Sequence, residues 1–209
     1  MTNYTQWKSL VDLHEYSAIP DGTVLLPEED DLNHFVGDTE LFSVDNGDKS
    51  REQEFVLTSN DGPDIYSSSG LPNYPSVGDT HEIWFWAAET DWGFDLGFAA
   101  SDRVNDADAY QTRIRSDGSF ELNRRDSGSK IDLDTTGFSI STQEWYRLEM
   151  GHESNGDISV SLIDESQNVL ETLNANDTTH ITDGEYDSEG VYINQFWSTE
   201  TRYEGWIIL

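Results

Sequence analysis

A chain of 209 residues is long enough to bury a hydrophobic core without covalent staples, and the absence of cysteine excludes disulfides and thiolate metal sites. The 42 acidic and 11 basic residues give a formal net charge of −31, which argues against electrostatic binding to nucleic acid or to an anionic membrane. The aromatic content of 12% excludes a disordered acidic chain, because such chains hold few aromatic residues.

The acidic residues are spread along the chain, and lysine occurs only at Lys8, Lys49 and Lys130. A folded protein with this charge repels itself at low ionic strength. At 1 M salt the Debye length is about 3 Å, so the repulsion is screened. The composition therefore favours a protein adapted to molar salt, from a halophilic archaeon or from a virus of such an organism.

This interpretation predicts how stability depends on salt. We expect the folded domain to lose stability on dialysis from molar salt to low ionic strength, because screening is what allows a compact state at −31. Thermal unfolding followed by circular dichroism across that range measures the effect. A melting temperature that stays constant would contradict the halophile interpretation.

The first 21 residues differ from the rest of the chain. Residues 5–16 carry apolar side chains at helical spacing, and the dipeptide Asp21-Gly22 is typical of a turn. We therefore predict an N-terminal arm over 1–21, which serves as a docking segment, and one domain over 22–209. The start has neither the basic nor the apolar region of a signal peptide, and no apolar run is long enough to span a membrane.

The predicted elements after the arm are short strands. In the strand at 83–87, Ile83, Phe85 and Ala87 alternate with Trp84 and Trp86. Both sets are apolar, which predicts burial on both faces. Asp117-Gly118 between two alternating segments predicts a hairpin. Many short strands at regular intervals are typical of a sandwich or barrel. In chain order, the predicted strands are 23–26, 41–44, 54–57, 83–87, 94–99, 110–115, 120–122, 131–133, 145–150, 158–163, 169–173, 191–196 and 206–209.

From Phe35 onward, the order of several segments carries a family pattern. It consists of an opening strand at 37–44, a loop at 65–74, a central hairpin at 110–124, a W-Y-x-L-E strand at 145–149 and a last strand at 203–207. In this order the chain resembles the concanavalin A-like lectin/glucanase superfamily, in its laminin-G-like branch. The resemblance implies an all-β fold, a jelly-roll sandwich of two antiparallel sheets. It implies no single activity, because this fold serves lectins, hydrolases and structural modules.

The resemblance also implies where a metal would lie. Laminin-G-like folds often hold one Ca²⁺ at the rim, and Asp38 and Glu204 occupy the corresponding places, with 28–31 as a further source of oxygen ligands. The alternative is that these acids are ordinary solvated residues of a halophilic protein.

Three acids match a catalytic pattern of the same superfamily. Glu185, Asp187 and Glu189 have the E-x-D-x-E spacing of retaining glucanases, which places three carboxylates on one strand face. They lie between Gly184 and Gly190 in a predicted loop near the C-terminus, whereas the family motif lies in mid-domain. We therefore predict that the protein is not an enzyme. The five histidines are scattered, which argues against zinc.

A group of basic and polar residues marks the predicted hairpin. By strand alternation Arg113 and Arg115 share a face, and Asn123 and Arg125 join them across the turn. This pattern predicts a docking patch for an anionic glycan or an acidic neighbouring subunit. The alternative is cross-strand pairing with nearby Asp and Glu.

Aromatic side chains near turns offer a second kind of contact. Trp92 and Tyr74 lie in or beside turn-rich stretches and are predicted to stack on sugar rings, with a place in the core as the alternative.

These features together predict a non-catalytic binding or structural module. Its preferred role is a surface-exposed virion protein of a haloarchaeal virus, such as a capsid turret, decoration or tail-fibre component, with host surface glycans as ligands. It would contact other virion subunits or itself through the arm, on a virion surface or outside the cell in high salt. The alternatives are an extracellular glycoside hydrolase of the laminarinase type and a cytoplasmic halophilic protein of unknown partner.

Overall fold

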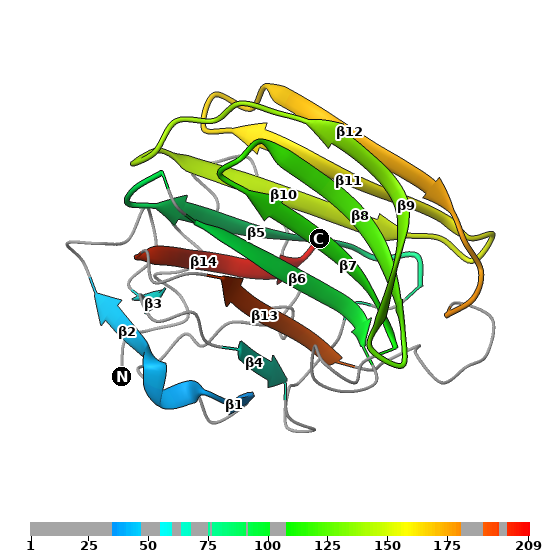
Figure 1. Cartoon of the computed structure of the whole chain (residues 1–209), viewed down its shortest axis with the longest axis horizontal. Coiled ribbons are helices and arrows are strands. Elements are labelled where there is room, and N and C mark those ends of the chain that lie inside the picture. Colours follow the sequence, from blue (N-terminus) through cyan, green and yellow to red (C-terminus); the bar gives the residue numbers. More distant parts are fainter. Residues whose placement is uncertain are drawn as a thin grey trace.

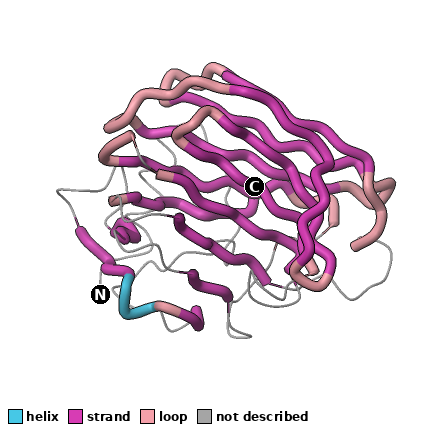
Figure 2. The backbone as a smooth tube through the Cα atoms, viewed as in Figure 1, coloured by secondary structure: helices cyan, strands magenta, loops and turns pink. Residues whose placement is uncertain are grey.

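The fold is a sandwich of two antiparallel β-sheets, seen in a computed structural model (Figure 1). The structure describes residues 35–46, 55–59, 64–67, 75, 77–90, 92–100, 108–180, 190–196 and 200–209. The predicted arm, the strand at 23–26 and the acids at 28–31 and 185–189 lie outside these residues. Strands make up most of the described chain (Figure 2). The predicted two-sheet jelly roll is confirmed.

One sheet has seven strands in the order β1-β4-β13-β6-β7-β8-β9. Its strands are β1 (Phe35–Gly37), β4 (Asp64–Ser67), β13 (Gly190–Phe196), β6 (Gly93–Ala100), β7 (Ala109–Arg115), β8 (Ser119–Asp126) and β9 (Ser129–Gly137).

The other sheet also has seven strands, in the order β12-β11-β10-β5-β14-β3-β2. Its strands are β12 (Val169–Asn176), β11 (Asp157–Asp164), β10 (Trp145–His152), β5 (Thr80–Ala87), β14 (Thr201–Ile208), β3 (Phe55–Ser59) and β2 (Phe42–Asn46). One turn of 3₁₀ helix, η2 (Thr39–Leu41), precedes β2.

Alternation along the strands builds the core between the sheets. In β6, Phe94 and its i+2 neighbours are fully buried and face the other sheet, where Phe85 of β5 meets Phe94 edge-on with ring centroids 4.9 Å apart. Tyr203 of β14 meets the same ring at 5.3 Å. The strand at β5 is buried along most of its length on both faces, as its sequence predicts.

The central hairpin forms where the turn signal lies. Gly118 has φ +88°, a left-handed conformation that glycine adopts without strain, and Asp117 accepts a hydrogen bond from the backbone N–H of Ser119 at 2.9 Å. The turn therefore sets the register of β7 against β8, with Arg113 opposite Glu121.

Two family-based predictions need correction. Residues 65–67, predicted as a loop, belong to β4, which pairs with both β1 and β13. The predicted opening strand at 37–44 is divided, because the 3₁₀ turn at η2 separates β1 from β2. Among the described residues, no helix is long and apolar enough to cross a membrane.

Candidate binding site

The outward side of five neighbouring strands is lined mostly by polar side chains, and we call it the polar face. Its central residues are almost fully buried: Asp95, Gln111, Asn123 and Tyr192. It lies on β13, β6, β7, β8 and β9, opposite to the side chains that fill the core. Strand pairing places its residues in rows across the sheet. One row is Tyr192, Gly97, Gln111, Asn123 and Asp132; the next begins with Asn194, Asp95, Arg113 and Glu121; the third begins with Phe196, Gly93 and Arg115.

A buried ion pair lies at the centre of the polar face. The Arg113 guanidinium donates two hydrogen bonds to the Asp95 carboxylate, with Nε–Oδ1 2.6 Å and Nη2–Oδ2 2.7 Å. The Asp95 side chain is 1% exposed and that of Arg113 13%. Burial raises the pKa of Asp95, and the charges of Arg113, Arg125 and Arg115 oppose that rise. The pair fixes the geometry of the face.

An aromatic ring from β13 reaches across β6 to the arginines of β7. Phe196 is paired with Gly93, which has no side chain to block the ring. The guanidinium carbon of Arg113 lies 4.9 Å from the ring centroid of Phe196, and that of Arg115 lies 5.6 Å from it. Phe196 therefore supports both guanidinium groups from one side.

A second ring crosses β6 in the same way one step along the sheet. A Cβ atom added to Gly97 would lie 2.0 Å from the Tyr192 ring, so only glycine fits beneath it. The Tyr192 hydroxyl donates a hydrogen bond to Oε1 of Gln111 on β7 at 3.0 Å. Burial raises the pKa of Tyr192 far above its ordinary value, so the hydroxyl stays protonated and remains a donor.

Two amide groups on the polar face have unused hydrogen-bonding atoms. Gln111 and Asn123 are directly opposite each other on β7 and β8, and both side chains are 0% exposed. Nε2 of Gln111 and Oδ1 of Asn123 have no hydrogen-bond partner. The Asn123 amide nitrogen reaches Glu121 Oε2 only at 3.4 Å. An unpaired buried donor or acceptor costs about 1–3 kcal/mol, so each one calls for an explanation, such as a water molecule, an ion or a ligand that completes the bonding.

The acids at the β8–β9 side of the face are held by one cation. Lys130 Nζ lies 2.5 Å from Glu121 Oε2 and 2.9 Å from Asp132 Oδ1. Together with the pair of Asp95 and Arg113, this leaves each described carboxylate of the polar face in contact with a basic group.

The structure brings together most of the residues predicted for the docking patch. Arg113, Arg115, Asn123 and Arg125 share one face, as the alternation predicted, but Arg113 is bound to Asp95, as the alternative of cross-strand pairing anticipated. Their part in binding stays a prediction. Sequence reasoning missed Tyr192 and Phe196, since the pairing of β13 with β6 joins segments about ninety residues apart, which no local pattern signals.

The two aromatic residues predicted to stack on sugar did not behave alike. Trp92 is 2% exposed and packs against Phe94 and Phe85 in the core, so it offers no open ring face, and that prediction is wrong. One edge of Trp92 lines a cavity of about 250 Å³ beside the Asp117-Gly118 turn. Tyr74 lies outside the described residues.

The predicted calcium ligands belong to different elements. Asp38 precedes the 3₁₀ turn, and Glu204 lies on β14, where it is paired with Trp84 and only 2% exposed. Neither belongs to a group of three or more His, Asp or Glu side chains that could share one ion within the described part of the chain. Calcium at these residues stays a prediction.

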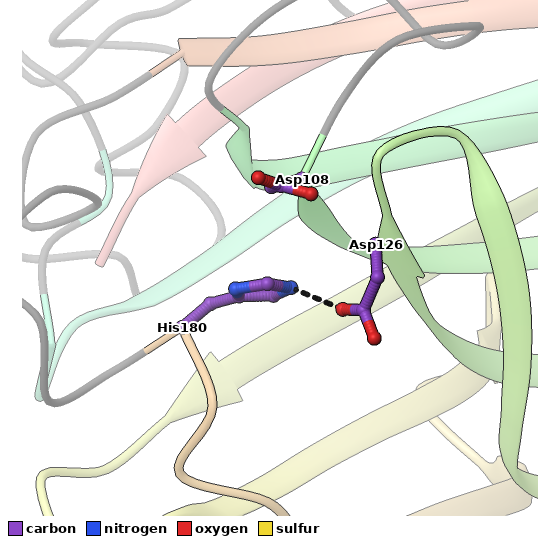
Figure 3. A group of neighbouring side chains, drawn as sticks. All are labelled: Asp108, Asp126 and His180. Atoms are coloured by element: carbon purple, nitrogen blue, oxygen red, sulfur yellow. Dashed lines mark ion pairs between the residues drawn. The ribbon is translucent and has the colours of Figure 1, made fainter.

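A different cluster of possible ligand atoms does occur, formed by Asp108, Asp126 and His180 (Figure 3). His180 Nε2 lies 2.9 Å from the carbonyl oxygen of Arg125 and 3.1 Å from Asp126 Oδ1. A carbonyl oxygen only accepts, so Nε2 carries the proton and cannot use its lone pair for a metal. Asp126 is also bound by Arg124 at 3.0 Å. These contacts serve a structural role, because they hold the segment after β12 against β8.

The fold has relatives among solved structures. No protein-family model matches the chain, and no curated protein sequence matches it. It is similar in structure to the carbohydrate-binding module CBM66 from Bacillus subtilis, with TM-score 0.57 and 13% identity over 84% of this chain and 94% of that one.

Two further structures are similar to the same degree. A protein of unknown function from Shewanella oneidensis has TM-score 0.56 and 11% identity, covering 99% of this chain and 95% of that one. A protein of unknown function with a galectin-like fold from Bacillus subtilis has TM-score 0.55 and 13% identity, covering 90% and 96%. At these identities the likeness establishes the fold class, a lectin-like jelly roll, and no more.

Proposed function

We propose that this protein is a non-catalytic carbohydrate-binding module that binds its glycan on the polar face. The observation that carries the proposal is the cross-strand pair of Gln111 and Asn123, whose amide nitrogen and amide oxygen are both without partners. A sugar hydroxyl donates and accepts at once, so one hydroxyl, or two adjacent ones, would satisfy both atoms once the groups that cover them move aside.

The surroundings of these amides support recognition of a polar, uncharged ligand. Tyr192 fixes the orientation of the Gln111 amide by donating to its oxygen, which leaves the nitrogen as a donor of known direction. The pair of Asp95 and Arg113 lies in the next row and is neutral as a unit. A rigid set of few polar groups held by strands is what a selective small-molecule site requires.

Two observations favour binding over hydrolysis. The described carboxylates of the polar face are ion-paired with Arg113 or Lys130, whereas glycoside hydrolysis needs one carboxyl group that is protonated. A similar structure, which matches 84% of this chain, is described as a carbohydrate-binding module.

Removal of the Asn123 amide tests the proposal. We expect Asn123→Ala to weaken glycan binding at least tenfold, because a site built to hydrogen-bond a hydroxyl is penalised when one partner is lost. The ligand is first found on an array of neutral and acidic oligosaccharides probed in molar salt, and affinity is then measured by titration calorimetry with the strongest binder.

Asn174→Ala is the matched control for this experiment. Asn174 is exposed on β12 of the other sheet, so the same change in composition leaves the polar face intact. We expect its affinity to equal that of the wild type. Equal binding by the Asn123 variant, or no binding of any array glycan by the wild type, would refute the proposed site or the proposed function respectively.

A surface role on a virion of a haloarchaeal virus is the finer form of this proposal. It is supported by the net charge of −31, which suits a protein exposed to molar salt. In that role, host surface glycans would be the ligands, and residues 1–21 would join the module to other virion subunits or to a second copy. Ca²⁺ bound at Asp38 and Glu204 is likewise proposed as a cofactor.

A further inference from the structure

Arg115 stands apart from most described arginines in a chain that holds 42 acidic residues. It makes no ion pair with a described carboxylate, and its Nε atom is buried with no hydrogen-bond partner. The nearest acid along the chain, Asp117, accepts a hydrogen bond from Ser119 in the turn. Four of the other described arginines contact an acid: Arg113, Arg124, Arg147 and Arg202.

The position of Arg115 is set by the ring beside it. Phe196 lies 5.6 Å from its guanidinium carbon, and the same ring supports Arg113 at 4.9 Å. Because Asp95 already neutralises Arg113 through two hydrogen bonds, the unbalanced positive charge at this ring belongs to Arg115. A guanidinium held against a ring and left unpaired is ready to bind a planar or tetrahedral oxyanion.

We propose that Arg115, supported by Phe196, is a subsite for an oxyanion carried by the glycan, either a sugar carboxylate or a sulfate ester. This inference rests on the proposed function, because it places the anionic group on the same ligand that hydrogen-bonds Gln111 and Asn123. It names the substrate class as acidic oligosaccharides.

The distance along β7 sets the minimum size of the ligand. Gln111 and Arg115 are four residues apart on one strand, which corresponds to about 13 Å at a rise of roughly 3.3 Å per residue. A single sugar ring does not extend over that distance. The ligand is therefore an oligosaccharide with its neutral hydroxyls at Gln111 and its acidic group at Arg115.

The test compares three trisaccharides by titration calorimetry in molar salt. The probes are a neutral galactose trisaccharide, its galacturonate counterpart with carboxylates, and a sulfated galactose trisaccharide. We expect the wild type to bind at least one acidic probe about tenfold more tightly than the neutral one. A tenfold difference in affinity is at the low end of what charge-assisted hydrogen bonds contribute. We expect the low end because Arg115 is partly exposed and salt screens its charge. The carboxylate and sulfate arms identify which oxyanion is preferred.

Three variants test whether the preference for the acidic probe depends on Arg115. We expect Arg115→Gln to abolish the preference for the acidic probe while leaving affinity for the neutral one within about twofold. Arg115→Lys, which keeps the charge but loses the planar group, should retain part of the preference. Arg202→Gln is the control, since it changes the net charge equally on the other sheet, on β14. It should behave as the wild type.

Each outcome decides one question. A wild type that binds the neutral and acidic probes equally, or an Arg115→Gln variant that loses both to the same degree, would overturn the oxyanion subsite. A wild type that binds none of the three probes and no array glycan would overturn the proposed function itself. Thermal unfolding of each variant confirms that the affinities are measured on folded protein.

Discussion

Replacement of Asp95 by leucine is expected to lower the free energy of unfolding by about 3–5 kcal/mol, the typical cost of leaving one buried charge without its partner. Asp95 is 1% exposed and holds Arg113 by two hydrogen bonds, of 2.6 and 2.7 Å. Leucine has the same branched outline as aspartate and is larger, so the loss reflects the unpaired guanidinium rather than a cavity. Chemical denaturation at constant molar salt measures it.

A double variant and a surface control separate charge from packing. Adding Arg113→Met to Asp95→Leu removes the second charge as well, and we expect most of the lost stability to return, because an apolar pair of similar volume often replaces a buried ion pair without net cost. Glu200→Leu removes the acid from Arg202 in a more exposed pair and should cost less than about 1 kcal/mol. Equal costs for Asp95→Leu and Glu200→Leu would contradict the structural role of the buried pair.

The second large effect is a loss of stability in acid through His81. Burial, assisted by the charge of nearby His152, lowers the pKa of His81 from 6.5 to about 3. Its Nδ1 accepts a hydrogen bond from Nε1 of Trp206 at 3.0 Å, and its ring lies 5.3 Å from that of Phe98. Protonation of Nδ1 would remove this bond and place a charge in the core, so the folded state resists it.

The direction of the pH effect follows from this lowered pKa. Above pH 6.5 His81 is neutral in both states, and its contribution to stability is fully present. As pH falls below 6.5 the unfolded state takes up the proton first, so stability is lost at about 1.4 kcal/mol per pH unit until the folded pKa is reached. We expect a loss of about 2 kcal/mol between pH 7 and pH 5 from this residue.

His81→Asn isolates that contribution. Asparagine keeps an acceptor for the Trp206 N–H and does not titrate. The slope of unfolding free energy against pH between 7 and 5 should be shallower in the variant by about 1 kcal/mol per pH unit. Taking the difference between the two proteins cancels the titration of the acidic residues that they share. Identical slopes would show that His81 is not buried as a neutral residue.

Local sequence patterns predicted the strands and one edge of the site. Alternation in β7 and β8, joined by Asp117-Gly118, was enough to place Arg113, Arg115 and Asn123 on one face, because the side-chain period of a strand is two and the turn fixes the register. The same logic predicted that β5 is buried on both sides. These are properties of neighbouring residues, and the chain encodes them directly.

The environment of each residue could not be predicted in this way. Trp92 stands beside a turn, which suggested the surface, yet it packs in the core between the two sheets. Asp95 was visible as an alternating polar position, but its partner depends on which strand lies next to β6. The exposure of a side chain and the partner it pairs with are decided by contacts with distant segments, and a local sequence pattern carries no information about those contacts.

The sequence alone therefore determined an all-β class and the facing of the central hairpin, because these follow from turn residues and a two-residue period. Only the tertiary structure decided that β13 lies against β6. That pairing brings Tyr192 over Gly97 and Phe196 beside Arg115, and so creates the polar face as a site. The reason is physical: long-range strand pairing is selected by burial of the whole core, and no segment carries that information by itself.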